Sequence, residues 1–508
     1  MASLSNGAPQ SNGHVRPRPS LGEFAFARSS RFRASYDAAR DSDEFKYYWA
    51  NSDSYDSDSA NSQAVRSKLV SRSRYEAGNN GYFDGIVQTY ATDVVGLGPQ
   101  LRMQTGSIGF NQMVESQWRR WAKVIKLRRK LWSLCHAKMQ DGEGFAMLHN
   151  NPRMRSAIKL DVLPFETEMC RTPFANYFDG NSVDGIDFDE FGNPEFYHVL
   201  KSHPGGSANL SGGFGESQRI PAKFIVHWFL LRRPGQHRAV PESTSTLNVG
   251  AAARRWREAT LAAAETAADI AALLTSNQSP NDEADEVAAM STLEFQKRML
   301  TALPMGWDAR QMEGKHPNAT FEAFHKQLVN EMARPKSMPY NKAACDSSQY
   351  NYASGRLDHQ TYYGALDVDR ADADDLVLEP IFESWIEEAI LEFGWLGGDP
   401  RQVDPMNLNH AWDWPKHRVA DIRAEASAND ITLKNGSRSL SRQYSDCGED
   451  FQDEIEKMAA DFGIDVDTMR QRLLDSLYPT SAIVADVSED EDEDKDEDKS
   501  QTQNDDDN

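Results

Sequence analysis

A mainly helical α+β fold is the class that this sequence of 508 residues predicts. Apolar residues recur at helical spacing in several long stretches, one of them rich in alanine. A shorter middle region carries β-branched and aromatic residues punctuated by Gly, Asn and Pro, which is typical of strands joined by tight turns. The length exceeds what one hydrophobic core usually fills, so several packed modules are expected in one chain.

The N-terminal residues 1–60 predict a mobile arm. They are poor in aliphatic residues and carry Ser and Asp runs, such as residues 52–59. No apolar stretch typical of a secretory signal is present there, and no run approaches the ~20 apolar residues of a membrane span. We therefore expect a protein made in the cytoplasm, with no membrane partner.

Two helices are expected next. Tyr82, Ile86, Tyr90 and Val94 lie at helical spacing and run into Gly96-Leu-Gly-Pro99, which ends the helix. A following helix carries two Trp residues at i, i+3 spacing, which indicates one buried face. These residues are Trp118 and Trp121.

Strands dominate the region after these helices. Turn sequences separate them, namely residues 191–194 and 203–206. The predicted strands are Phe145–His149, Ile158–Leu163, Phe196–Leu200 and Phe224–Leu230.

Residues 247–275 contain eleven alanines and predict a long helix, because Ala has the highest helix propensity. Trp256, Ala263, Ala267, Ile270 and Leu274 fall on one stripe of this helix. The opposite side carries Glu258, Glu265 and Asp269. The pattern fits both an ordinary amphipathic surface helix and a helix whose acidic side lines a water-filled channel.

Helices return after a polar segment. One is expected from about Thr320 to Ala333, and Pro335 ends it. Another resumes near Arg356, is interrupted at Pro380, and carries the apolar stripe Ile381, Trp385 and Ala389. A last helical pair is expected over residues 450–477.

The chain is acidic, with a formal net charge of -23, which weighs against tight DNA binding. Much of this charge lies in residues 489–508, where twelve Asp and Glu accompany only Lys495 and Lys499. We predict a disordered acidic tail over residues 481–508, with a specific docking tail as the alternative.

No motif for catalysis or cofactor binding is found, so we expect no catalytic residues, no cofactor and no metal. Gly314-Lys315-His316 lacks the rest of a phosphate-binding loop. Asp187 and Asp189 open like a calcium loop, but Phe191 and His198 stand at positions that need oxygen ligands. A plain hairpin turn is the better interpretation. The four cysteines form no C-x-x-C pair and are expected to be reduced.

The order of several short motifs resembles the lambda-type family of bacteriophage portal proteins. Two departures are Ala239, where Gly is expected after Arg238, and a loose fit beyond Pro415. The matching motifs are Asp93-Val-Val-Gly-Leu-Gly98, Trp118-x-x-Trp121, residues 185–192, Phe196-Tyr-His-Val199, His203-Pro204, Pro221-Ala222, His227, Arg233-Pro-Gly-Gln236, Met338-Pro-Tyr340, Asp346, residues 351–356 and Pro380-Ile-Phe-Glu-Ser-Trp385.

The resemblance implies a subunit of a ring, usually of twelve copies, that forms the channel for DNA at one capsid vertex. It serves DNA packaging, head–tail joining and ejection. The implied regions are a wing at 61–250, a first stem helix at 251–275, a clip at 276–319, a second stem helix at 320–334, a tunnel loop at 335–354, and the long helix, wing and crown at 355–480.

The resemblance also suggests candidate residues and partners. Glu258, Glu265 and Asp269 would line the tunnel, and Lys336, Asn341 and Lys342 would lie near DNA on the tunnel loop, unless this is a surface loop without contacts. Expected partners are other copies, the large terminase ATPase, the major capsid protein or scaffold, head–tail connector proteins, and double-stranded DNA without sequence specificity. The protein would be assembled in the host cytoplasm and reside in the virion. The alternatives are a head protease and a head-to-tail connector.

Overall fold

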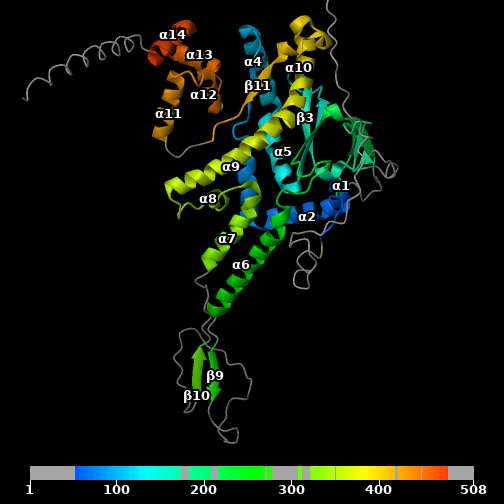
Figure 1. Ribbon diagram of the computed structural model, residues 1–508, viewed down its shortest axis with the longest axis vertical. Coiled ribbons are helices and arrows are strands. Elements are labelled where there is room, and N and C mark those ends of the chain that lie inside the picture. The colour runs from blue at the N-terminus through cyan, green and yellow to red at the C-terminus, as the bar shows by residue number, and fades with distance from the viewer. Residues whose placement is uncertain are drawn as a thin grey trace, which may run out of the picture. The chain divides into compact units, whose positions relative to one another are not determined.

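The computed structural model describes residues 52–172, 182–206, 216–268, 272–276, 307–311, 321–348, 350–417, 422–447 and 449–478. The chain divides into residues 1–55 and 56–508, and the described helices and strands lie in the second unit. Helices predominate, with small antiparallel sheets among them (Figure 1). The predicted fold class, mainly helical α+β, is confirmed.

The end of the predicted N-terminal arm is folded, which corrects its boundary. Helix α1 (Ser57–Ala60) lies inside the predicted arm, and Ser57 is buried. Asp58 accepts hydrogen bonds from the backbone N–H of His237, at 3.0 Å, and from its Nδ1, at 2.7 Å. These contacts with a distant segment order a polar stretch whose composition alone favours mobility.

The main core lies among helices that are distant in sequence. The predicted Trp pair is buried at its centre, and the ring of Trp118 lies 4.9 Å from that of Trp121 and 5.3 Å from that of Trp385. The predicted stripe Ile381, Trp385, Ala389 is also buried, so both patterns are confirmed. Helices that contribute buried residues to this core include α3 (Gly81–Val95), α4 (Ile108–Ile125), α5 (Leu127–Asp141) and α10 (Glu379–Phe393). Helix α2 (Gln63–Asn79) packs partly buried residues against it.

The strands form two sheets in the predicted region. β2 is the central strand of the order β3-β2-β8, and the second sheet has the order β4-β5-β6-β7. All four predicted strands are confirmed, as β2, β3, β6 and β8. The strands are β2 (Glu143–Asn150), β3 (Leu160–Phe165), β4 (Ser182–Val183), β5 (Ile186–Phe188), β6 (Pro194–Leu200), β7 (Ser217–Pro221) and β8 (Ile225–Phe229).

The hairpin between β5 and β6 confirms the predicted turn. The Asp189 carboxylate accepts hydrogen bonds from the backbone N–H groups of Phe191 and Asn193, at 2.9 and 2.8 Å. Gly192 adopts a φ of 84°, which Gly tolerates without steric cost. Local hydrogen bonds to the Asp189 carboxylate therefore explain this sequence without a calcium ion.

Helix α6 (Leu247–Ala268) and the next helix in the chain, α7 (Phe321–Ala333), run antiparallel (Figure 1). A Cβ on Gly250 would lie 3.5 Å from the Met332 sulfur, whereas Trp256 stacks on Phe321 at 4.5 Å. Thus the start of α6 meets the end of α7. We call this pair the α6–α7 hairpin.

The alanine-rich helix is shorter than predicted. It ends at Ala268, and Ala272–Ser276 forms strand β9, which pairs with β10 (Trp307–Gln311). The prediction of helix through Thr275 is therefore wrong. Helix propensity is a weak preference that non-local strand pairing can override, and sequence periodicity does not register such pairing. Most of the predicted clip, and Ile270 of the predicted stripe, lie outside the described residues.

The segment after α7 contains two short helical turns, so it is less of a loop than predicted. They are a 3-10 turn (Arg334–Lys336) and α8 (Tyr340–Ala343). Helix α9 (Tyr352–Ala373) then continues through a π-helical turn (Asp374–Leu378) directly into α10. Pro380 lacks a backbone N–H, and the wider π turn before it lets the helix continue where an interruption was predicted.

The last described part is a group of short helices. Strand β1 (Gln100–Met103) pairs with β11 (His410–Asp413), which connects the start and end of the fold. The predicted final helical pair is confirmed as α13 and α14, whose buried contacts include Ile455 and Met469. The helices are α11 (Ile422–Lys434), α12 (Leu440–Asp446), α13 (Phe451–Phe462) and α14 (Val466–Leu477).

Candidate functional site

In the α6–α7 hairpin, Trp256 of the predicted apolar stripe packs against α7, whereas Leu274 of that stripe lies on β9. Trp256 lies against α7, with ring centroids 4.5 Å from Phe321 and 5.1 Å from Phe324. Glu258 and Glu265 are exposed. Glu258 lies 3.8 Å from Arg254 of the same helix and keeps 67% of its side chain accessible. Asp269, the third tunnel-lining candidate, lies outside the described residues.

Four buried charged side chains join both ends of this hairpin to the core. Glu242 precedes α6, Lys336 follows α7, Lys138 is on α5 and Asp369 is on α9. The Lys138 ammonium lies 2.9 Å from Glu242 and 2.7 Å from Asp369. Lys336 lies 3.1 Å from Asp369 and also pairs with Glu242. We call these four residues the root cluster.

The root cluster is electrically balanced, with two cations and two anions. Burial alone would lower the pKa of Lys138, but Glu242 and Asp369 outweigh burial and raise it. Burial would raise the pKa of both acids, yet the two lysines hold the pKa of Glu242 and of Asp369 below their ordinary values. Lys138, Glu242 and Asp369 therefore stay charged at neutral pH. Tyr90 of α3 accepts a hydrogen bond from Lys138 at 3.3 Å.

This arrangement corrects the expectation for Lys336. Its side chain is only 6% exposed, and its ammonium is taken up by Glu242 and Asp369. Lys336 is therefore a structural group at the root of the hairpin and is not presented to DNA. Sequence reasoning missed the cluster because its members come from four segments that only the tertiary structure brings together.

The other two tunnel-loop candidates lie on α8 and are partly exposed. Lys342 pairs with Asp93 at 3.1 Å, and the Tyr362 hydroxyl of α9 donates to the same carboxylate at 3.2 Å. Asn341 contacts His359 of α9, with 2.9 Å between Nδ2 and Nε2. Both residues therefore hold α8 against α3 and α9, and neither belongs to the root cluster.

A second buried ion pair joins the start of β2 to the segment that follows β8. Arg238 and Glu143 form a bidentate pair with two 2.8 Å hydrogen bonds. Burial would raise the pKa of Glu143, but Arg238 outweighs it and holds this pKa well below the ordinary range. The Ala239 N–H also donates to Glu143 at 2.7 Å.

A family model, that of the lambda family of phage portal proteins, matches residues 48–368. The chain belongs to this family. The resemblance read from the order of short motifs is thereby confirmed, and the protein is a phage portal protein and a component of the virion.

This portal protein is also similar to individual proteins, at low sequence identity. It is 24% identical over 394 residues to the "Probable portal protein" of Halomonas phage phiHAP-1, covering 72% of this chain and 75% of that relative. Two solved structures are similar, one from the virion of a native gene transfer agent particle and one from the neck of an empty particle computed with C6 symmetry. Each has 15% identity and covers 75% of this chain and 93% of the other, with TM-scores of 0.40 and 0.41.

Residues of the family motifs make contacts that hold the fold of this portal protein together. Asp93, which opens the first motif, anchors Lys342 and Tyr362. Ala239, the departure from the expected Gly, is buried and is not among the residues with positive φ, so the backbone there does not require Gly. Among the described residues, no helix is long and apolar enough to cross a membrane.

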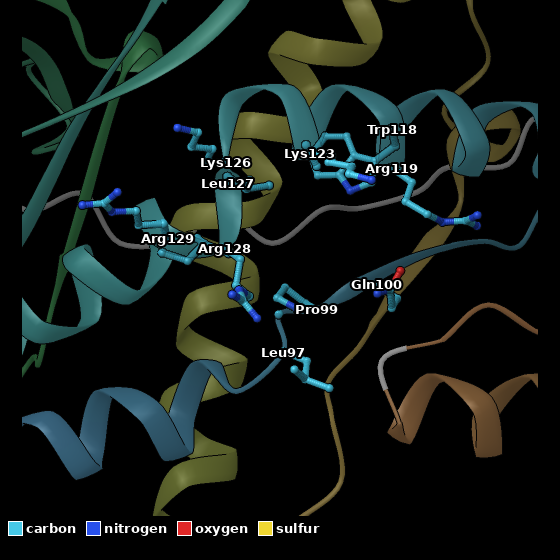
Figure 2. Close-up of a pocket in the computed structure, with 13 residues that line it drawn as sticks. Leu97, Pro99, Gln100, Trp118, Arg119, Lys123, Lys126, Leu127, Arg128 and Arg129 are labelled. Carbon is cyan, nitrogen blue, oxygen red and sulfur yellow. The ribbon is translucent and has the colours of Figure 1, made fainter.

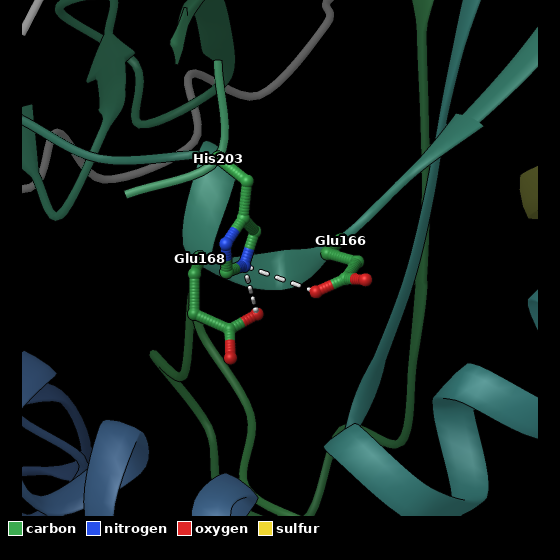
Figure 3. Close-up of side chains that lie close together, drawn as sticks. All are labelled: Glu166, Glu168 and His203. Atoms are coloured by element: carbon green, nitrogen blue, oxygen red, sulfur yellow. Dashed lines mark ion pairs between the residues drawn. The ribbon is translucent and has the colours of Figure 1, made fainter. Parts of the chain in front are cut away.

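Glu166, Glu168 and His203 lie close enough together to suggest a metal site (Figure 3). His203 Nε2 lies 3.0 Å from Glu166 and 3.8 Å from Glu168. Arg74, however, already lies 3.1 Å from Glu166 and 2.9 Å from Glu168. Arg74 thus already occupies oxygens of both carboxylates, so the group is explained as an ion-pair network around this arginine.

Proposed function

We propose that this portal protein assembles into a ring, of twelve copies as is usual for such rings, whose central channel conducts double-stranded DNA during packaging and ejection. Membership of the portal family supports the proposal. The observation that carries it is the α6–α7 hairpin, in which apolar residues face the partner helix and Glu258 and Glu265 remain exposed. In this proposal α6 and α7 are the stem, and the acidic side of α6, including Asp269, faces the channel.

An acidic channel wall suits a conduit that must not retain its cargo. Each Lys or Arg contact with a phosphate would release counterions and add affinity for DNA, which would slow its passage. Carboxylates make no such contact and repel the phosphates. Among the tunnel-loop candidates, the charge of Lys342 is balanced by Asp93, and Asn341 is uncharged. Neither residue would therefore bind phosphate strongly.

The root cluster gives the proposed stem a fixed base. Moving DNA would exert force along the hairpin, and both of its ends enter the core through Glu242 and Lys336. Breaking one buried partner leaves an uncompensated charge and costs about 3–5 kcal/mol. The cluster would therefore resist displacement of the hairpin from α5 and α9.

The remaining regions and partners follow the portal assignment. We propose that residues 61–250 form the wing, that residues 276–319 form the clip, and that residues beyond 355 form the long helix and crown. The clip would meet the large terminase ATPase and later the connector proteins, while the wing would meet the capsid protein or scaffold. The protein itself would act without catalysis, so the ATPase would supply the energy. Assembly would take place in the host cytoplasm.

Charge reversal on α6 tests the channel proposal. The double variant Glu258→Lys and Glu265→Lys should slow or stall DNA packaging, because lysines in the wall would bind passing phosphates. A matched control is Glu190→Lys and Glu195→Lys, which reverses two exposed charges on the β5–β6 hairpin. Packaging rates would be measured in an assembly reaction with each variant. Equal rates for the two double variants would rule out the placement of α6 at the channel.

A further inference from the structure

Exposed cations gather around a cavity where α4 meets α5. The cavity has a volume of about 430 Å³ and lies between this junction and the bend at Leu97–Gln100 (Figure 2). Lys123, Lys126, Arg128 and Arg129 line it and are exposed. Figure 2 shows the side chain of Arg128 directed toward the bend. We call these four residues the basic rim.

The basic rim differs from the other cations nearby. Lys130 pairs with Asp161, and Arg119 lies 2.9 Å from Asp450. Within the described part of the chain, no ion pair or hydrogen bond occupies the side chains of the basic rim, and no acidic residue lines the cavity. Four exposed cations without a counter-charge are notable in a chain whose net charge is -23. Like charges so close repel one another, so an anionic ligand would stabilise them.

The cavity also has an apolar side. Trp118, Leu127 and Leu131 contribute to its lining, as do Leu97 and Pro99 of the bend. Leu97 is 48% exposed, although it is a large aliphatic residue. A ligand that fits this cavity therefore combines apolar groups with several negative charges.

One segment of this chain has that composition. Residues 482–487, Ala-Ile-Val-Ala-Asp-Val, are mostly apolar, and ten residues from Glu489 to Asp498 carry nine carboxylates and one lysine. We propose that this segment, residues 482–498, docks on the cavity, with its apolar part against Leu97 and its carboxylates on the basic rim. We call it the tail segment.

Chain connectivity supports this occupant. Arg119 lines the cavity and pairs with Asp450, the N-cap residue of α13. Helix α14 packs on α13 and ends at Leu477, so only a few residues separate it from the tail segment. The tail segment thus departs from a helical pair that is tied to the wall of the cavity. Either the same copy or an adjacent copy can supply it.

Docking of the tail segment has a consequence for nucleic acid. The basic rim offers four cations that phosphates would otherwise bind through counterion release. A tethered polyanion occupies them at high effective concentration and excludes DNA. The tail segment then acts as a tethered competitor that keeps the basic rim from holding DNA. This inference does not depend on where the channel lies.

Zero-length cross-linking with a carbodiimide tests the contact in the full chain, because this reagent joins carboxylates to lysine amines that touch. Mass spectrometry should find the Asp and Glu residues of the tail segment joined to Lys123 and Lys126 at least about fivefold more often than to Lys201 or Lys457. Those two lysines are exposed and serve as controls. Cross-links distributed equally over the four lysines would overturn the proposal.

Binding of a 24-base-pair duplex at about 50 mM salt tests the competition. Replacing the nine carboxylates of residues 489–498 by Asn and Gln in the full chain should tighten DNA binding at least about tenfold. Adding Lys123→Gln and Arg128→Gln should abolish this gain, whereas Lys68→Gln and Arg72→Gln, two exposed cations of α2, should not. If the unmodified chain binds DNA at the basic rim as tightly as the tail variant, DNA is the occupant and the proposal is wrong.

Discussion

Buried charges fix the position of individual residues in this portal protein. Glu143 and Arg238 form a bidentate pair, and the root cluster places two lysines between two carboxylates. Such groups do not raise stability much relative to apolar residues of the same size, but removing one partner is costly because the others stay buried and charged. They specify which segments meet, and here they select the junction of the α6–α7 hairpin with the core.

Replacing Lys336 by Met should destabilise the subunit by about 3–5 kcal/mol, because Glu242 and Asp369 would share one cation in a buried site. The matched control is Lys342→Met, which removes a lysine 29% exposed and paired with Asp93. This change should cost at most about 1 kcal/mol. Urea unfolding followed by Trp fluorescence measures both. Equal shifts of the midpoint would show that the root cluster contributes no more than a surface pair.

Stability should fall as the pH is lowered from about 5 to about 3. The pKa values of Glu143, Glu242 and Asp369 are lowered in the folded state, because their cations outweigh burial. The unfolded chain then binds more protons than the folded chain in this window, so their stabilisation is complete above their unfolded pKa values of about 4 and is lost below them. Thermal unfolding at successive pH values measures this loss.

Asp374 should give a smaller effect of opposite sign. Burial raises the pKa of Asp374 to about 6, so its ionisation at neutral pH disfavours the folded state. Stability should therefore rise slightly as the pH falls from 7 toward 5, before the decline begins. Asp374→Asn should reduce this rise, because the amide does not titrate. A rise that persists in the variant would assign the effect to another group.

At the scale of elements, the α6–α7 hairpin depends on a few aromatic contacts. Trp256 contacts Phe321 and Phe324, and many of the other residues on α6 are alanines that bury little area. Helices in proteins gain most of their stability from packing of one face, so this Trp holds the distal part of α6 against α7. The root cluster thus holds the hairpin to the core, and the Trp256 contacts hold its two helices together farther from the core.

Trp256→Ala should loosen α6 and α7 without unfolding the core. Each aromatic contact contributes about 0.5–1.5 kcal/mol beyond the area it buries, and the variant loses two of them. Hydrogen exchange should quicken in residues 252–262 and 321–328 while α5 and α10 keep their protection. Trp256→Phe should retain much of the wild-type protection. Faster exchange across the whole chain would indicate global destabilisation instead.

At the scale of the whole molecule, charge is distributed unevenly. The acidic tail carries about ten of the net negative charges, the basic rim is an isolated positive surface, and the acidic side of α6 is exposed. This distribution matches a protein that handles DNA without holding it, because phosphate binding requires accessible Lys and Arg.

Purified protein should form rings with a central hole in negative-stain electron microscopy, as expected for a portal. Closed ring symmetry requires two complementary surfaces on each subunit, which a chain of this size can supply. Size-exclusion chromatography with light scattering gives the mass of the assembly in parallel. A monodisperse monomer under assembly conditions would contradict the ring proposal.

The sequence by itself determined the family, the mainly helical α+β class, the four strands, and the burial of Trp118, Trp121 and Trp385. These features depend on local periodicity, turn chemistry and motif order, all of which are present in the linear pattern. It also predicted that Trp256 of α6 would pack against a neighbour and that Glu258 and Glu265 would be exposed.

Only the tertiary structure decided the end of α6, the role of Lys336, and the presence of the root cluster. The helix ends before β9 because residues 272–276 pair with residues 307–311, far along the chain. Lys336 is buried because Glu242 and Asp369, distant in sequence, converge on its ammonium. Strand pairing and ion pairing between distant segments leave no periodic signal in the sequence. They can therefore be seen only in the tertiary structure.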